Sequence, residues 1–162
     1  KKFSLDLLCF SLLPTHFHFL LKQKTDATIA QFMNSLLVGH AKFFNTKYQR
    51  VGPLFQGRFK AKMVEQEEYL LQLSRYIHRN NLPKNINSGF TSGETQNFRD
   101  LLRNYPYSSY RNYLGKKIYP FVQTETILSY FSKTNPQLSY QSFVEDTKED
   151  LEALAPWIFD TV

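Results

Sequence analysis

The sequence predicts an α+β protein, because strand-like and helix-like patterns follow one another along the chain. Two apolar runs flank a turn at Pro14 and Thr15, which favours an antiparallel hairpin. The chain has 162 residues, 42% of them apolar, which suffices for one core and an appended segment. The expected elements are strands at 3–12, 15–22 and 58–63 and helices at 25–45, 65–80, 124–132 and 140–154.

The second strand carries two histidines one residue apart. Side chains alternate across a strand, so His16 and His18 are expected to project from one face and Phe17 and Phe19 from the other. Neutral imidazole is a common metal ligand, and a pair at this spacing could bind one divalent ion. The alternative is that two histidines fall by chance on the solvated face of a strand.

The helix expected at 25–45 is interpreted as a packing element, and the strand expected at 58–63 as a basic surface. Thr25 or Asp26 is expected to cap the first helix. In the alternating run at 58–63, the basic residues share one face and could follow a phosphate backbone, although a solvated strand face is the alternative. The apolar residues expected in the core are Ile29, Phe32, Met33, Leu36, Leu37, Phe43 and Phe44 of the helix and Phe59, Ala61 and Met63 of the strand.

The helix expected at 65–80 places Tyr76 and Asn80 four residues apart and therefore on one side. From spacing alone, a packing tyrosine and a capping asparagine remain open alternatives. The polar residues 84–98 are expected to form a surface loop. The four tyrosines between 105 and 113 could stack on unpaired bases or pack in the core.

Charge and composition narrow the class of partner. Residues 1–144 carry 19 Lys or Arg against 8 Asp or Glu, and no acid occurs between Ala27 and Val64. A long region of one sign suggests a polyanion, most often nucleic acid, whereas a merely soluble basic surface is the alternative. The single cysteine, Cys9, is expected in the core of a cytoplasmic protein, and no apolar run is long enough to suggest a membrane span.

Four blocks in order resemble the HUH single-tyrosine transposases, the insertion-sequence 200-like family, and within it the REP-associated branch. The similarity spans roughly residues 3–115, with Thr15 where the family usually has asparagine and Asn81 where it usually has proline. Four ordered blocks are far more specific than the two histidines alone. The blocks are Pro14–Leu21, Arg50–Lys60, Tyr69–Asn80 and Ser108–Tyr110.

The resemblance implies a role for each matched residue. His16 and His18 would bind a divalent ion, Mg²⁺ or Mn²⁺, and Asn80 would add a side-chain oxygen ligand. Tyr76 would be the nucleophile that cleaves and rejoins hairpin-bearing single-stranded DNA through a 5′-phosphotyrosine. The DNA-binding residues would be Arg50, Arg58, Lys60 and Lys62.

The resemblance also implies a fold and a domain layout. We expect a ferredoxin-like antiparallel sheet with helices on one face, whose first strand and helix would lie upstream of Lys1. The transposase-like domain is expected at 1–115, and a short helical C-terminal extension at 116–162. A nucleoid-associated monomer or homodimer would fit. The alternative function is a catalytically inactive domain that binds structured DNA or RNA.

Overall fold

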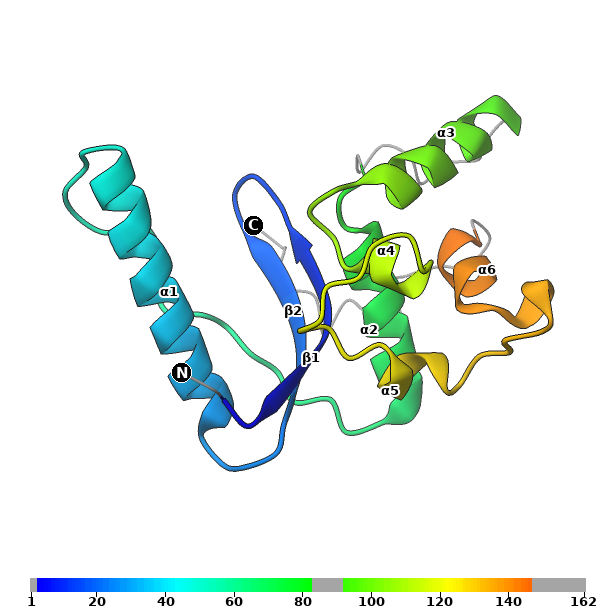
Figure 1. Ribbon diagram of the computed structural model, residues 1–162, viewed down its shortest axis with the longest axis horizontal. Helices are drawn as coiled ribbons and strands as arrows, with labels where there is room; N and C mark the ends of the chain where they lie inside the picture. Colours follow the sequence, from blue (N-terminus) through cyan, green and yellow to red (C-terminus); the bar gives the residue numbers. More distant parts are fainter. Residues whose placement is uncertain (1–2, 83–91, 147–162) are drawn as a thin grey trace. The chain divides into compact units, whose positions relative to one another are not determined.

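The computed structural model describes residues 3–82 and 92–146, without the side chains of 92–95, and shows an antiparallel hairpin followed by helices (Figure 1). The predicted α+β class is therefore confirmed. Two compact units are present. One comprises Lys1–Leu5 and Gln23–Met63, and the other comprises Asp6–Lys22 and Val64–Val162. The predicted domain boundary at 115–116 stays a prediction.

The hairpin joins β1 (Leu5–Leu12) to β2 (Phe17–Gln23). Its turn is closed by a hydrogen bond of 2.8 Å from the Leu13 amide to the His16 carbonyl, with Pro14 and Thr15 at the tip. The ring of Pro14 fixes φ near the value that the first central position of a common turn requires. The predicted hairpin is confirmed, but His16 closes the turn and β2 begins one residue later.

Residues from the C-terminal half of the chain form hydrogen bonds with the edge of β1 that does not pair with β2. The Leu12 amide donates to the Tyr107 carbonyl at 2.8 Å, and the Ser109 amide donates to the Phe10 carbonyl at 2.9 Å. Farther along β1, the Gln123 amide donates to the Leu7 carbonyl at 2.9 Å. These contacts satisfy backbone groups that an open strand edge would leave unpaired.

Helix α1 (Thr28–Lys47) follows the hairpin within the other compact unit. Its N-cap is Ala27, in a left-handed conformation with φ 58°, so the predicted capping by Thr25 or Asp26 is wrong. Of the apolar stripe, Met33 is buried and four members are half-buried, whereas Leu36 and Phe43 are exposed. The helical period is thus confirmed, but the core assignment holds for only part of the stripe. The half-buried members are Ile29, Phe32, Leu37 and Phe44.

The segment 58–63 is not a strand, and this prediction is wrong. Phe59 is half-buried, but Ala61 is exposed and Met63 is 74% exposed, so the expected inward face does not form. A strand needs a hydrogen-bonded neighbour as well as alternation. In the described part of the chain, the only sheet is the pair β1–β2.

The second unit contains the remaining helices. The helix expected at 65–80 is present, whereas the surface loop expected at 84–98 is wrong where it is described, because a helix covers 92–98. Phe98 and Leu102, four residues apart, are each 1% exposed and anchor that helix in the core. The last helix ends at Glu145, because Asp146 is extended, and the part of the predicted helix at 147–154 lies outside the described residues. The helices are α2 (Glu67–Arg79), α3 (Ser92–Asn104), α4 (Tyr110–Tyr113), α5 (Glu125–Leu128), η2 (Pro136–Leu138) and α6 (Tyr140–Glu145).

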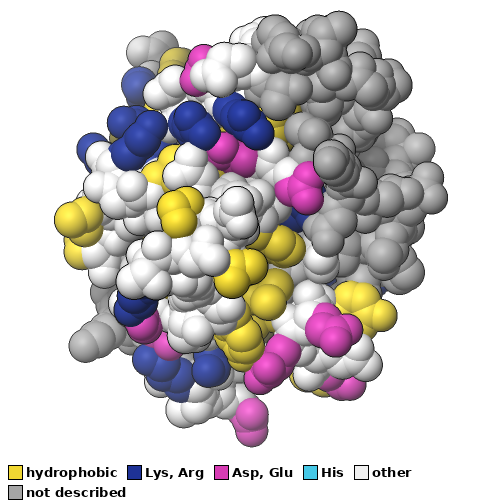
Figure 2. Space-filling view, turned by 90° about the vertical axis from the view of Figure 1, so that its right-hand side faces the viewer, with side chains coloured by type: hydrophobic (Ala, Val, Ile, Leu, Met, Phe, Trp, Pro, Cys, Tyr) yellow, Lys and Arg dark blue, Asp and Glu magenta, His cyan; other side chains and the backbone are white. Residues whose placement is uncertain are grey.

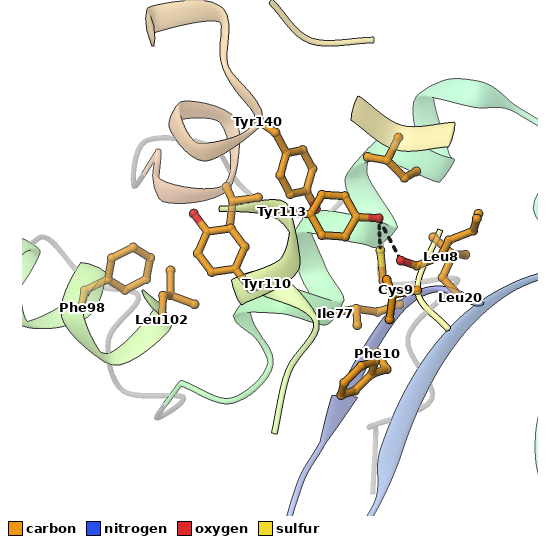
Figure 3. Close-up of a cluster of buried hydrophobic side chains, with 13 residues drawn as sticks. Leu8, Cys9, Phe10, Leu20, Ile77, Phe98, Leu102, Tyr110, Tyr113 and Tyr140 are labelled. Atoms are coloured by element: carbon orange, nitrogen blue, oxygen red, sulfur yellow. Dashed lines mark hydrogen bonds between the residues drawn. The ribbon is translucent and has the colours of Figure 1, made fainter. Parts of the chain in front are cut away.

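The core of this unit gathers side chains from β1, β2 and every α-helix from α2 to α6 (Figure 3). Cys9 is fully buried, as predicted, and its Sγ lies 3.4 Å from the Tyr113 hydroxyl, which donates to the Leu8 carbonyl at 2.9 Å. Burial raises the pKa of the Cys9 thiol to about 12. Tyr110 and Tyr113 are buried, so the core alternative is correct for these two rings, whereas Tyr107 is 60% exposed.

The surface mixes charges of both signs. On the face drawn in Figure 2, Lys and Arg side chains lie beside Asp and Glu side chains, so this face is not uniformly positive. Within α6, the carboxylate of Glu145 accepts two hydrogen bonds from Arg103, at 2.7 and 2.5 Å, and one from the Tyr110 hydroxyl. Among the described helices, none is long and apolar enough to cross a membrane.

Two isoleucines test whether α5 is part of the core. Ile127 is 0% exposed and Ile118 is 81% exposed. We expect Ile127→Ala to lower the free energy of unfolding by about 2–5 kcal/mol and Ile118→Ala to change it by less than about 0.5 kcal/mol. Urea unfolding followed by circular dichroism measures both. Equal effects of the two substitutions would contradict the packing of α5.

Candidate active site

The two histidines lie side by side where the turn meets β2, His16 just before the strand and His18 within it. Their ring centroids are 5.0 Å apart and the rings are perpendicular. His16 is exposed and His18 is half-buried. The close pair that the spacing predicts is therefore present in the structure.

The side chain of Thr15 contacts the first imidazole. Its hydroxyl lies 3.0 Å from Nδ1 of His16. When Nδ1 is protonated, it donates to the threonine oxygen, and Nε2 carries the lone pair that a metal ligand needs. A hydrogen bond on the second ring nitrogen fixes the tautomer of a ligating histidine in this way.

The last turn of α2 brings Tyr76 and Asn80 to the histidines. The Tyr76 ring meets the His18 ring edge to face, at 5.8 Å between centroids. The Asn80 Nδ2 lies 3.1 Å from Nε2 of His18. Asn80 is the C-cap residue of α2 and keeps helical dihedral angles, so the spacing of four residues places both side chains on one side. The structure thus brings all four predicted residues together around His18.

The sequence of α2 explains why this side faces the hairpin. Glu67 and Glu68 lie in the first turn, where the positive end of the helix dipole favours acids. Leu73 and Ile77 are 8% and 4% exposed and pack into the core. Burying this apolar side sets the rotation of the helix about its axis, which in turn determines where Tyr76 points.

The donor set fits a small divalent ion. Ligands adjacent on an octahedral ion with bonds of about 2.1 Å lie about 3.0 Å apart, close to the 3.1 Å between the His18 Nε2 and the Asn80 amide. The nitrogen and oxygen of a side-chain amide exchange places by a half-turn, so Oδ1 can occupy the position of Nδ2. The described residues contain no group of three or more His, Cys, Asp or Glu side chains that could hold a metal ion, so a site here would need the Asn80 amide as its third ligand.

The predicted DNA-binding residues lie in the other compact unit. Arg50, Arg58, Lys60 and Lys62 are all exposed. The Arg50 guanidinium lies over the Phe44 ring at 5.7 Å. The residues between 58 and 63 do not form the expected strand, so the structure does not align the three basic side chains on one strand face.

His78 is a site residue that the sequence did not single out. It is 0% exposed, and its two nitrogens lie 2.8 Å from the hydroxyls of Ser109 and Tyr140. Burial lowers its pKa to about 3. A histidine inside a helical pattern carries no sequence signal of burial, since its partners lie 31 and 62 residues away.

Two buried arginines lie next to His78 on α2. Arg75 and Arg79 are 0% and 8% exposed. Each donates to the carbonyl of Asp146, at 2.5 Å from Arg75 Nη2 and 3.0 Å from Arg79 Nη1. Burial and the neighbouring Arg75 lower the pKa of Arg79 to about 10. Arg79 therefore stays charged at neutral pH.

The fold and the site together define an α+β protein in which two histidines, a tyrosine and an asparagine share one surface. Residues 1–80 match the family described as "Transposase IS200 like". The match includes all four of these residues. No curated protein and no solved structure matches the chain. The match suggests the class of transposases, which act on DNA.

The burial of His78 predicts a pH dependence of stability. The unfolded chain binds a proton near the ordinary pKa of 6.5, and the folded chain does so only near 3. Stability therefore falls as pH drops below about 6.5, by up to about 1.4 kcal/mol per pH unit for one group. We expect His78→Gln to remove this contribution from the slope between about pH 6.5 and pH 5, measured by urea unfolding. An unchanged slope would contradict a neutral, buried His78.

Proposed function

We propose that the chain is a metal-dependent transposase that cleaves and rejoins hairpin-bearing single-stranded DNA through a phosphotyrosine. The observation that supports this proposal most directly is the position of His18, which contacts the Asn80 amide at 3.1 Å and the Tyr76 ring at 5.8 Å. Three residue types needed for metal-assisted phosphoryl transfer are thus close together. The match of residues 1–80 to a transposase family supports the same reaction class.

His16, His18 and Asn80 would hold the ion, which we propose to be Mg²⁺ or Mn²⁺. Two imidazole nitrogens and one amide oxygen suit Mn²⁺ well and leave positions for phosphate oxygens and water. When bound, the ion would polarise the scissile phosphate and neutralise its developing charge. The His16 and His18 ring centroids lie 5.0 Å apart, which is close enough for the two imidazoles to be neighbouring ligands.

Tyr76 would attack the phosphorus. Its phenolic oxygen forms a bond to phosphorus and loses its proton, while the bond from phosphorus to the 3′ oxygen breaks and that oxygen gains a proton. The products are a 5′-phosphotyrosine and a free 3′-hydroxyl. One phosphodiester replaces another, so a second attack by a 3′-hydroxyl can rejoin strands without a nucleotide cofactor. The edge-to-face contact with His18 would hold the ring near the phosphate.

Arg50, Arg58, Lys60 and Lys62 would bind the phosphates of the DNA strand. All four are exposed and lie in the region from Ala27 to Val64, which carries no acid. Exposed Lys and Arg release counterions when they contact phosphates, so such binding weakens with salt. The absence of a regular strand at 58–63 does not remove this electrostatic contribution, which needs charge more than fixed geometry.

Tyr76→Phe tests the proposed chemistry directly. The substitution keeps the ring that packs on His18 and removes only the nucleophilic hydroxyl. With a labelled hairpin-bearing single strand and Mn²⁺, we expect wild-type protein to form a denaturation-resistant adduct and Tyr76→Phe to lose it by at least about 10³-fold. Chelation of the metal should abolish the adduct as well.

Tyr107→Phe is the matched control, since Tyr107 is exposed and outside the proposed metal site. It should form the adduct at the wild-type level. DNA binding by wild-type protein with no adduct under Mn²⁺ or Mg²⁺ would reject the cleavage proposal and favour the binding-only alternative. A preference for RNA over matched DNA would favour an RNA-binding module.

The salt dependence of binding tests the basic residues. Loss of three phosphate contacts in the triple variant Arg58→Gln, Lys60→Gln, Lys62→Gln should lower the slope of log affinity against log salt by about 2 on single-stranded DNA. Fluorescence anisotropy over a range of NaCl concentrations measures the slope. Lys133→Gln removes a base that pairs with Glu125 at 3.5 Å, and it should leave the slope unchanged. An unchanged slope in the triple variant would exclude these residues as phosphate contacts.

A further inference from the structure

A third side of helix α2 faces away from the four site residues and carries buried polar groups, among which His78 packs against the rings of Tyr110, Tyr113 and Tyr140. This side carries Ser74, Arg75, His78 and Arg79, which are 0%, 0%, 0% and 8% exposed. Burying so many polar groups is unfavourable unless each finds a partner. The partners on this side come from residues 109, 140 and 146, which lie beyond the family match.

The hydrogen bonds on this side form one directional chain from β1 to α2. The Phe10 amide donates to the Ser109 Oγ at 2.8 Å, which fixes the start of the chain. At the other end, the Ser74 Oγ donates to the Leu71 carbonyl at 2.7 Å, so it must accept from the Tyr140 hydroxyl, at 3.0 Å.

These two ends determine the tautomer of His78. The Tyr140 hydroxyl donates its single proton to Ser74. Nδ1 of His78 must therefore donate to the Tyr140 oxygen, which lies 2.8 Å away. Nε2 of His78 is then the acceptor for the Ser109 hydroxyl at 2.8 Å, a shorter contact than the 3.3 Å from that hydroxyl to the Phe10 carbonyl. Each hydroxyl and the imidazole therefore donates one proton and accepts another, and only a neutral His78 completes the chain.

This chain of hydrogen bonds links α2 to the hairpin on the side opposite to the candidate active site, so that both ends of the connection lead to His18. β2 carries His18 and pairs with β1, and β1 is bonded through Ser109 to His78. His78 lies on α2 midway between Tyr76 and Asn80, and Asn80 returns to His18. A helix that slides by one residue moves by about 1.5 Å. The contact between Asn80 and His18 would not survive such a shift.

We propose that His78, Ser109 and Tyr140 are positioning residues that hold Tyr76 and Asn80 at the metal-binding histidines. This inference rests on the proposed function. The three residues touch neither the ion nor the DNA in this arrangement; they fix the height and rotation of α2 against the hairpin. α6 thereby contributes to the active site although it lies outside the family match. The carbonyl of Asp146, which binds Arg75 and Arg79, holds the same helix from the other end of α6.

Tyr140→Phe tests this inference with little disturbance to packing. The Tyr140 ring stays against Tyr113, at 4.6 Å, and Phe131, at 5.1 Å, and only the hydroxyl is lost. Tyr119→Phe is the matched control, because that hydroxyl donates to the Pro106 carbonyl at 3.3 Å and makes no contact with α2.

The first readout is Mn²⁺ binding by isothermal titration calorimetry in the absence of DNA. We expect Tyr140→Phe to weaken Mn²⁺ affinity about tenfold and Tyr119→Phe to leave it unchanged, since residues that orient metal ligands have effects of this size. The second readout is the rate of adduct formation at saturating DNA. It should fall about tenfold in Tyr140→Phe and recover in part at high Mn²⁺, with unchanged DNA affinity.

Ser74→Ala removes the final link of the chain and serves if Tyr140→Phe does not fold. It should weaken Mn²⁺ affinity in the same direction. A lower melting temperature with wild-type Mn²⁺ affinity and adduct rate would overturn the inference and leave the proposed function intact. Wild-type protein that neither binds Mn²⁺ nor forms an adduct would instead reject the proposed function, and the inference with it.

Discussion

One buried, uncharged imidazole constrains the second unit of this protein. His78 forms hydrogen bonds with two separate parts of the chain, at Ser109 and at Tyr140, and both of its ring nitrogens are used. A shift of α2 would orphan several buried polar atoms at once, each at a cost of about 1–3 kcal/mol. Apolar packing around Leu73 and Ile77 tolerates small adjustments, but a directional network does not. The polar side of α2 therefore specifies one position of the helix, and the apolar side supplies most of the stabilisation.

The parts of the fold that follow from local pattern could be predicted from the sequence. The hairpin needs only two apolar runs around Pro14, and α2 needs only a periodic stretch with acids at its start. The closeness of His16 and His18, and of Tyr76 and Asn80, follows from the periods of strand and helix. The contact between the histidine pair and the pair Tyr76 and Asn80 depends on tertiary structure, which the spacing within each element does not predict. The resemblance to a family provided that link.

The failed predictions share a cause. A sequence pattern shows which side chains favour burial or a given secondary structure, but it does not show which distant residues will pack against them. The run at 58–63 alternates as a strand does, yet the described chain offers it no neighbouring strand. Leu36 and Phe43 keep the helical period of α1 without being covered. Helix α3 was missed because its apolar anchors, Phe98 and Leu102, lie at the end of a polar stretch typical of loops and just after it. His78 was overlooked because its partners are distant in sequence.

Because its single cysteine, Cys9, is buried, the folded protein is expected to react only slowly with thiol reagents. Cys9 is the only cysteine of the chain, it is fully buried, and its thiol is held far from the reactive thiolate form at neutral pH. A cysteine introduced on the surface would thus be the sole point of attachment for a fluorophore or spin label. Reaction at Cys9 itself requires the hydrophobic core to open, so slow labelling of the unmodified chain measures how often that opening occurs.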